Sequence, residues 1–356
     1  MRRKSRPPAV CATVVVKIGN SMFKTAAPCA LLLLALSSHV AVAEPIELRL
    51  AFFSSDQSMT YLAAIKPFVD AVNLEGHDQI KIVLYSGGVL GREVAQQPDV
   101  VLDGKADIAF VVPGYTPARF PDNTVVELPG LFSDTRDATL VYTRLIALHA
   151  LKGYDDFFVL GAYVSEPETI HSRLPIASIG DLKGQRIRVN NSSEAATLEK
   201  LGAIPVPMQI TKVTSAISSG EIDGAAVPRT PLSDYGIKRV ATNHYFLGIN
   251  GAPLVLLMNR NKLEALPKPA QDIIRKYSGE WSAERFIQIY DRSDVQILEQ
   301  LKSDPKRNVV FPSSSDLEIA HTAFRSVIAE WAAKSSHDSA LLKLTEAELA
   351  KLRATR

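Results

Sequence analysis

Apolar residues recur along the chain at alternate positions in some stretches and at three-to-four-residue spacing in others, and these patterns predict strands and helices in turn. In the first half we expect, in order, a strand over 46–52, a helix over 59–74, a strand over 79–85, a helix over 93–102 and a strand over 107–112. Strands that alternate with helices are typical of a mostly parallel sheet with helical crossovers.

The same order returns after a proline-rich segment over 114–121. There we expect strands over 185–189, 204–206 and 224–227 and helices over 194–201 and 212–218. The two halves also share a local pattern, because Val101-x-x-Gly104-x-x-Asp107-x-Ala109 matches Ile217-x-x-Gly220-x-x-Asp223-x-Ala225. In each pattern Gly suits the left-handed residue that ends a helix, and Asp opens the next strand. Two interpretations stay open, namely two similarly wound lobes or two ordinary helix-to-strand turns.

Beyond the second half the pattern predicts one long helix. After an apolar strand over 254–259, an amphipathic stretch runs from Pro269 toward Leu301 with large apolar residues at helical period. We expect this helix to brace both lobes, and a strand near Val309 and two further helices to close the chain. With 356 residues the chain is long enough for two lobes. The predicted fold class is α/β, with two lobes and mostly parallel or mixed sheets.

The expected domain organisation has three parts. Residues 1–43 form a signal peptide, residues 44–164 with about 252–312 form lobe 1 and the long helix, and residues 165–251 with about 313–356 form lobe 2 and the C-terminal helices. Each lobe is thus built from two separated stretches of the chain. We expect the lobes to close about a hinge when a ligand binds.

The first 43 residues are typical of a secretory signal. They contain six Lys or Arg and no acid, and a basic stretch that begins at Met22 precedes an apolar run over 29–36. Residues 41–43, Ala-Val-Ala, have the small-residue pattern of a cleavage site, and the apolar run is too short to span a membrane. We therefore expect translation to start at Met22 and the protein to be periplasmic and soluble after cleavage.

Removal of this segment changes the charge and the available chemistry. The chain has 40 Lys and Arg against 38 Asp and Glu, and the loss of six cations leaves 34, so the mature chain is near −4. This balance argues against nucleic acid as a partner. Both cysteines, Cys11 and Cys29, lie in the segment, so the mature chain has no disulfide and no thiol chemistry.

Two arginines alternate with aliphatic residues in the strand over 185–189. Arg186 and Arg188 lie on one face, and Arg188 comes last, where the strand gives way to Asn190 and a polar turn. Ligands of open α/β sheets bind beyond the carboxyl ends of the strands, and a guanidinium can hold a carboxylate through two parallel hydrogen bonds. Arg188 therefore fits a carboxylate-binding role. The alternative for Arg188 is a surface arginine paired with an acid. We expect Arg186, which lies further from the strand end, to be solvent-exposed or structural.

Further candidates follow other strands. Phe53 and Ser54 end the first strand and Tyr115 follows the third, so they are positioned to line a cleft, although packed core or loop residues fit the same pattern. No two histidines of the mature chain have metal-ligand spacing, and phosphate-loop, nucleophile and zinc motifs are absent from the sequence. We therefore expect no cofactor, no metal and no catalytic residue, and hence a binding protein rather than an enzyme.

Seven short motifs follow one another over residues 46–312. They are Tyr85-Ser86-Gly87-Gly88-Val89-Leu90-Gly91, Gly104-Lys105-Ala106-Asp107-Ile108, Phe120-Pro121 with Leu128-Pro129, Asp181-Leu182-Lys183-Gly184 through Arg188, Leu201-Gly202-Ala203 to Met208, Gly220 to Gly224, and Leu266-Pro267. In this order they resemble the substrate-binding subunits of tripartite ATP-independent periplasmic (TRAP) transporters of the C4-dicarboxylate-binding type. The resemblance implies two lobes that close on a small carboxylate, a long helix across both, and integral membrane TRAP permease subunits as partners. It also implies that Arg188 is the carboxylate-binding arginine.

The chain departs from the family where the ligand would bind. Sialic-acid-binding relatives carry a second arginine near Glu168, an acid and an amide at Ala226 and Val227, an aromatic residue at Ile210, and an acid near Val112. The pocket implied here keeps one cation and is otherwise more apolar, with Glu168 as an added acceptor. We therefore favour a monocarboxylate with an apolar body, such as a 2-oxo, hydroxy or aromatic acid, slightly over a dicarboxylate.

The sequence thus predicts a periplasmic solute-binding protein, monomeric and two-lobed, that captures a small organic acid and delivers it to a TRAP permease. The expected ligand-binding residues are Phe53, Ser54, Tyr115, Glu168, Arg188, Asn190, Ile210 and Val227. Three alternatives stay open: a binding protein of an ATP-dependent importer, a sensory receptor, and a periplasmic enzyme acting on an organic acid.

Overall fold

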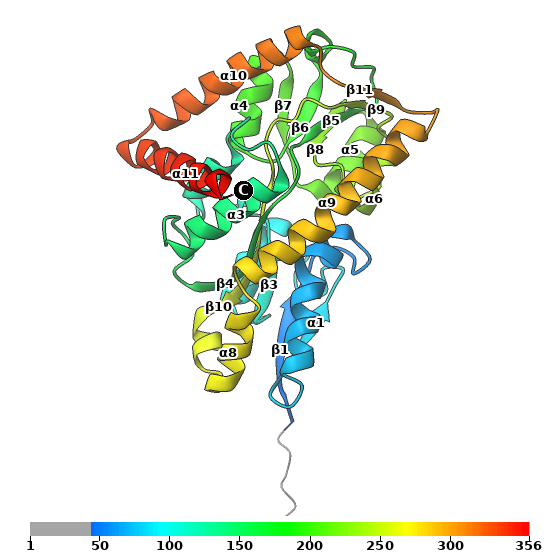
Figure 1. Cartoon of the computed structure of the whole chain (residues 1–356). Helices are drawn as coiled ribbons and strands as arrows, with labels where there is room; N and C mark the ends of the chain where they lie inside the picture. Colours follow the sequence, from blue (N-terminus) through cyan, green and yellow to red (C-terminus); the bar gives the residue numbers. More distant parts are fainter. Residues whose placement is uncertain (1–43, 356) are drawn as a thin grey trace, which may run out of the picture. The chain divides into compact units, whose positions relative to one another are not determined.

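The computed structural model describes residues 44–355, and the structural statements below concern this range. The expected signal peptide over 1–43 and its expected start at Met22 lie outside the described residues. The strands form one sheet of five and one of six, and helices pack around both (Figure 1). The predicted two-lobed α/β fold class is confirmed.

The first sheet has the strand order β2-β1-β3-β10-β4. Its strands are β1 (Ile46–Ala51), β2 (Ile80–Tyr85), β3 (Ile108–Val111), β4 (Phe157–Val164) and β10 (Pro253–Asn259). β1 runs parallel to β2 and β3, as the alternation with helices predicts, whereas β10 is antiparallel to both neighbours. Every residue of β3 is buried, as expected for a strand that is covered on both faces.

The second sheet has the strand order β11-β9-β5-β8-β6-β7. Its strands are β5 (Thr169–Ser172), β6 (Arg186–Val189), β7 (Ile204–Pro207), β8 (Gly224–Val227), β9 (Asn243–Tyr245) and β11 (Asn308–Val310). β6 runs parallel to β7 and β8, whereas β5 is antiparallel to β8 and β9. Both sheets are therefore mixed, and each holds a parallel three-stranded unit like the one predicted.

Helices supply the crossovers and the outer layers. The longer ones are α1 (Lys66–Glu75), α2 (Gln97–Leu102), α3 (Thr135–Ala147), α4 (Ser192–Lys200), α5 (Val213–Ser219), α8 (Lys268–Lys276), α9 (Glu280–Ser303), α10 (Ser314–Ala332) and α11 (Ser336–Ala354). Two short helices are α6 (Pro231–Asp234) and α7 (Arg260–Glu264). A π-helical turn, η1 (Tyr61–Ile65), precedes α1, and the 3-10 helices η3 (Pro113–Tyr115) and η4 (Pro121–Glu127) follow β3.

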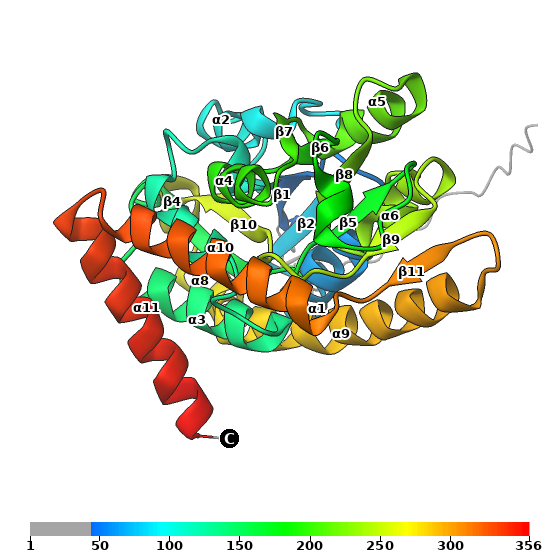
Figure 2. The same ribbon diagram turned by 90° about the horizontal axis from the view of Figure 1, so that it is seen from above.

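The prediction of one unbroken helix from Pro269 toward Leu301 is wrong. The chain forms two helices, α8 and α9, because Gly279 has a φ of 62°, in the left-handed region that no helix interior accepts. The apolar period continues across the break, where Tyr277 and Trp281 pack edge to face with ring centroids 4.8 Å apart. Helix α9 by itself contacts both sheets, through β4 of the first and β11 of the second. Figure 2 shows it beside α1 and α3.

The structure divides the chain between the lobes differently at two places. β11 pairs with β9, so residues 308–310 belong to the second sheet, although the expected boundary groups them with lobe 1. The last helix, α11, packs on α3 and contributes Leu341, Leu349 and Leu352 to the core of the first lobe, not the second. Helix boundaries alone could not reveal this, because an amphipathic helix does not specify which lobe receives its apolar face.

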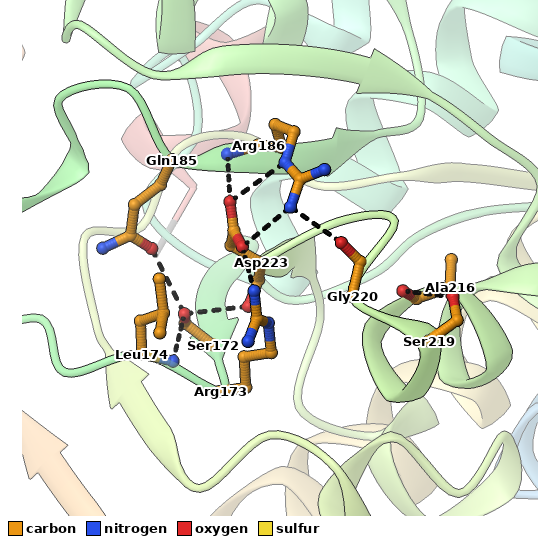
Figure 3. A network of polar contacts seen from close by, with 9 residues as sticks. All are labelled: Ser172, Arg173, Leu174, Gln185, Arg186, Ala216, Ser219, Gly220 and Asp223. Carbon is orange, nitrogen blue, oxygen red and sulfur yellow. Dashed lines mark hydrogen bonds and ion pairs between the residues drawn. The ribbon is translucent and has the colours of Figure 1, made fainter.

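In the second lobe, Asp223 is held by hydrogen bonds from Arg186 at the start of β6, as Figure 3 shows. Asp223 Oδ2 accepts hydrogen bonds from the Arg186 backbone N at 2.9 Å and from Arg186 Nε at 3.3 Å. Arg186 Nη2 also donates to Gly220 O at 2.7 Å, and Gly220 has a φ of 76°. Burial alone would raise the pKa of Asp223, but hydrogen bonds from Arg186 and Arg173 lower it to about 2.

The first lobe repeats this arrangement around Asp107. Asp107 Oδ2 accepts from the Arg49 backbone N at 2.7 Å and lies 3.6 Å from Arg49 Nε. Arg49 Nη2 donates to Gly104 O at 2.8 Å, and Gly104 has a φ of 69°. The pattern shared by the two halves of the sequence therefore marks equivalent helix-to-strand turns in two similarly wound sheets.

Candidate functional site

A cavity of about 60 Å³ lies between residues that follow the carboxyl ends of strands in both sheets. From the first sheet and its loops it is lined by Phe53, Phe110, Val112, Tyr115 and Leu254. From the second sheet and its loops it is lined by Glu168, Arg188, Asn190, Ile210 and Tyr235. This is the place where open α/β sheets bind their ligands.

Arg188 supplies the positive charge of the cavity, and it is only 2% exposed. The parallel pairing of β6 with its neighbours brings two backbone carbonyls to the guanidinium. Nε donates to Met208 O at 2.8 Å, and Nη1 donates to Ala226 O at 3.0 Å. These bonds fix the plane of the guanidinium, so its remaining N–H groups have a set direction before any ligand arrives.

The outer edge of the Arg188 guanidinium contacts neutral oxygens. Nη2 donates to the Tyr115 hydroxyl at 2.5 Å and lies 3.5 Å from Asn190 Oδ1, at the limit of a hydrogen bond. Nη1 keeps one further hydrogen, because only its contact with Ala226 O is made. One oxygen of a carboxylate can meet that hydrogen while the other replaces the long Asn190 contact.

Tyr115 links the two lobes at the cavity. It ends η3 after β3 of the first sheet, and its hydroxyl accepts from Arg188 and, at 2.9 Å, from the Ile210 backbone N of the second lobe. Burial raises the pKa of Tyr115, so the hydroxyl stays protonated. Because both contacts are accepted, the hydroxyl hydrogen is available to donate to a ligand.

Three carboxyl groups are buried beside Arg188. Glu168 precedes β5, Glu194 lies in the first turn of α4, and Glu127 ends η4. Burial is the largest cause that raises the pKa of each, to about 8 for Glu127 and well above the ordinary carboxyl value for Glu168. The charge of Glu194 raises both of these further. At neutral pH the set therefore carries less negative charge than three carboxylates would.

The rest of the wall is largely aromatic and aliphatic. The rings of Phe53 and Phe110 are tilted with centroids 6.0 Å apart. Tyr235 follows α6 and Tyr290 comes from the middle of α9, so the helix that touches both sheets also reaches the cavity. Such a wall favours a ligand with a planar or apolar body, because burying apolar surface is the main non-directional gain on binding.

Six of the eight residues expected to bind ligand line this cavity. They are Phe53, Tyr115, Glu168, Arg188, Asn190 and Ile210. Ser54 does not; its side chain is hydrogen-bonded to Tyr235, which does line the cavity. Val227 is fully buried in the core beneath the second sheet, and the next residue, Pro228, faces the cavity instead. The one-residue difference reflects the alternation of a strand, which turns successive side chains to opposite faces.

Sequence reasoning missed several groups that the fold brings to the site. Glu194 has the pattern of an ordinary helix-start acid, and Tyr290 is one member of a long apolar stripe. Tyr235 lies in a short helical region without any motif. Only the orientation of two lobes joins these residues with Arg188, and no local spacing signals it.

Two histidines of the second lobe form a pair and do not line the cavity. His171 and His244 are fully buried on paired strands of the second sheet, and their Nδ1 atoms are 2.7 Å apart in a hydrogen bond. Burial lowers the pKa of both, to about 4 for His244. Among residues 44–355 no cluster of three or more His, Cys, Asp and Glu is arranged to hold a metal ion. None of the helices in that range combines the length and apolar character needed to cross a bilayer.

A larger cavity of about 500 Å³ lies beside α3, β4 and α8 of the first lobe. It also contains arginines, but their guanidiniums already have partners in the chain. Arg144 lies 3.8 Å from a Glu280 oxygen, Arg260 donates to two backbone carbonyls, and Arg275 stacks over the Phe158 ring. It is built from one lobe alone, so domain closure cannot enclose a ligand there. The smaller cavity between the lobes is the better candidate site.

Known proteins resemble this chain along most of its length. The sequence profile of the bacterial extracellular solute-binding proteins, family 7, matches residues 50–335. The sialic acid-binding periplasmic protein SiaP of Vibrio cholerae is 24% identical over 308 residues, which are 84% of this chain and 92% of that protein.

Two solved structures share the fold. A TRAP solute-binding protein from Rhodoferax ferrireducens T118, in complex with copurified benzoate, has a TM-score of 0.80 and 26% identity, covering 87% of this chain and 99% of that one. A marine metagenome TRAP solute-binding protein specific for aromatic acid ligands, in complex with 3-hydroxybenzoate, has a TM-score of 0.80 and 25% identity over the same shares.

The family profile spans both sheets and the cavity between them, and the ordered motifs lie within it. The predicted resemblance to TRAP substrate-binding subunits is thereby confirmed, whereas the ligand, for which the sequence slightly favours a monocarboxylate over a dicarboxylate, stays a prediction. This chain belongs to the bacterial extracellular solute-binding proteins of family 7, which capture organic acids for TRAP transporters.

Proposed function

We propose that the protein captures an aromatic monocarboxylate in the periplasm, as a monomer freed from its signal peptide, and hands it to TRAP permease subunits. The observation that carries this proposal is the state of Arg188. This buried cation is hydrogen-bonded to two carbonyls, a hydroxyl and an amide oxygen, and none of these partners is a carboxylate. A ligand carboxylate would give the guanidinium a directly bonded anion, and such a pair is among the strongest hydrogen-bonded contacts.

The composition of the cavity supports a single carboxylate on an aromatic body. Arg188 is the cationic residue among those that line the cavity, and the other walls include Phe53, Phe110 and Tyr290. A second carboxylate of a dicarboxylate would be buried without a cation to offset its charge. The two relatives with benzoate and 3-hydroxybenzoate are consistent with this ligand class.

The proposed mechanism is closure of the two lobes over the ligand. Contacts between the lobes frame the cavity: Tyr115 bonds to Arg188 and Ile210, and Asp234 of α6 accepts from the Met59 backbone N at 3.0 Å. Closure excludes water, which strengthens the pair between Arg188 and the carboxylate and holds the acid for delivery.

Calorimetric titration with benzoate and with succinate tests the proposal. We expect benzoate to bind and to stabilise the folded protein by about 2.7 kcal/mol at a concentration of about 100 Kd, since it binds the native state alone. Tighter binding of succinate or malate than of any monocarboxylate would overturn the ligand class. Mass spectrometry of small molecules that copurify with the protein provides an independent identification.

A further inference from the structure

We propose that Glu168 and Glu194 hold one proton between them, and that the site binds its anion only while this proton is present, so ligand affinity falls as the pH rises. The inference rests on the proposed function, because it concerns an anion held by Arg188. The inference goes beyond the proposed function because it makes Glu168 a neutral hydrogen-bonding group that selects for monoanions, whereas the sequence led us to expect only an added acceptor.

The position of Glu194 is fixed by the start of α4. Asn191 caps the helix by accepting from the Glu194 backbone N at 2.8 Å, and Glu194 Oε2 in turn accepts from the Asn190 backbone N at 2.6 Å. This reciprocal cap aims the carboxyl back toward the end of β6, where Arg188 lies. Glu194 is fully buried, so water cannot solvate its charge.

The other oxygen of Glu194 requires a donor. Glu194 Oε1 and Glu168 Oε2 are both buried, and neither accepts a hydrogen bond from an N–H or O–H group of the described residues. The two carboxyl groups interact with each other, and the interaction with Glu194 adds to the rise in the pKa of Glu168. Two carboxylates cannot share a hydrogen bond without a proton, so one of the pair is protonated. The orphan oxygens and the mutual contact thus have one explanation.

The titratable groups that face the Glu168 and Glu194 pair come from three further elements. Arg188 on β6 is the facing cation, Glu127 at the end of η4 is a third buried carboxyl, and Tyr115 on η3 stays neutral. With one shared proton, Arg188 and the pair together have zero net charge. Without it they carry one negative charge, and a ligand anion would then enter a buried site that repels it.

Burial is the largest cause that raises the pKa of Glu168, and the charge of Glu194 adds to it, while Arg188 opposes both. A ligand anion beside Arg188 offsets the cation that favours ionisation, so binding should raise the affinity of the pair for its proton. By linkage, the proton must raise the affinity for the anion by the same factor. The repulsion by an ionised pair and this linkage between proton and ligand both favour a ligand with a single negative charge.

The test is the affinity for benzoate from about pH 6 to about pH 9, a range in which benzoate itself stays ionised. We expect the wild-type Kd to rise with pH, approaching about tenfold per pH unit once the shared proton is lost. Glu168→Gln should bind benzoate with a Kd that varies much less with pH, because a neutral amide replaces the protonated carboxyl. Glu199→Gln, on the exposed face of the same helix, should keep the wild-type profile.

Glu127 requires its own variant, since its pKa of about 8 falls in the same range. Glu127→Gln should retain a fall in affinity with pH; if it alone abolishes the fall, the proton belongs to Glu127 and the inference is wrong. Calorimetry of the wild type in two buffers of different ionisation heat adds a measurement that needs no variant. Uptake of a fraction of a proton on binding supports the inference.

The possible failures are distinct. Wild-type protein that binds benzoate with the same Kd at every pH, or Glu168→Gln with the wild-type profile, would overturn the shared proton and leave the proposed function intact. Wild-type protein that binds no benzoate at any pH would overturn the proposed ligand class itself. A folded Glu168→Gln protein that has lost all binding would also contradict the inference, because the amide reproduces the neutral state.

Discussion

The two lobes are built on the same turn but differ at the residue that matters for binding. In each lobe a strand arginine contacts the aspartate that directly precedes a neighbouring parallel strand: Arg49 contacts Asp107 on the first sheet, and Arg186 contacts Asp223 on the second. Both arginines are about 41% exposed at the side chain and satisfy their donors within the chain. This part of the structure stabilises the fold and is repeated.

The lobes differ two residues after these arginines, on the same face of each strand. The first sheet has Ala51 at the end of β1, whereas the second has Arg188 near the end of β6. Arg186 is paired with a carboxylate at the edge of the protein, and Arg188 is buried among neutral partners. The comparison teaches that an arginine hydrogen-bonded to an acid supports structure, whereas a buried arginine with no acid among its hydrogen-bond partners is suited to binding an anion.

The largest effect on ligand binding should come from substitutions of Arg188, the residue at which the two lobes diverge. Arg188→Ala should weaken benzoate binding by roughly 30-fold or more, since truncating one partner of a buried charge pair costs about 2–5 kcal/mol. Arg188→Lys should also fail, because an ammonium cannot form the two parallel hydrogen bonds of a guanidinium. Calorimetry at neutral pH measures both.

The matched controls are Arg186→Lys on the same strand and Arg49→Lys at the equivalent position of the first lobe. Both should bind benzoate within about twofold of the wild type, because exposed ion pairs contribute little beyond their own neighbourhood. If Arg188→Lys kept wild-type affinity, the special role of the buried guanidinium would be refuted.

The next effect concerns stability instead of binding. Asp223→Asn should lower the free energy of unfolding by about 2 kcal/mol, since the difference between the ordinary pKa of 3.8 and the value of about 2 in the fold measures its interaction with Arg186 and Arg173. The pKa is lowered by folding, so the stabilisation is present above about pH 4 and lost as the pH falls toward 2. Urea unfolding at neutral and acidic pH measures the difference.

Asp107→Asn extends the comparison to the first lobe. Its carboxylate accepts from the Arg49 backbone N and lies 3.6 Å from Arg49 Nε and 3.3 Å from Lys262 Nζ, so we expect a loss of stability and an unchanged affinity for benzoate. A large loss in one lobe with none in the other would contradict the structural equivalence of the two turns.

The sequence was a sound guide where local patterns have one physical meaning. Alternation put Arg188 and Arg186 on one face, and a Gly before an Asp marked the same turn in both lobes. It misled where a property depends on distant parts of the chain. The amphipathic period continued through Gly279, although the backbone there is left-handed. Glu168 was expected to be an acceptor, and sequence spacing gave no sign that burial and the charge of Glu194 raise its pKa.

The smallest predicted effect tests how the two unlike lobes cooperate. Tyr115 is the first-lobe residue that bonds to Arg188, and Tyr115→Phe removes the hydroxyl while keeping the ring in the cavity wall. The closed form would then bury the Ile210 N–H and one Arg188 N–H without an acceptor, whereas in an opened form water can solvate both.

The loss should therefore appear in ligand affinity, as a decrease of roughly 5- to 10-fold or about 1 kcal/mol, with little change in the stability of the ligand-free protein. Calorimetry with benzoate measures the first and urea unfolding the second. A Tyr115→Phe protein with unchanged affinity would mean that the hydroxyl contributes nothing to closure. In that case the binding energy would come from Arg188 and the apolar wall alone, and the first lobe would act only as a cover over the site.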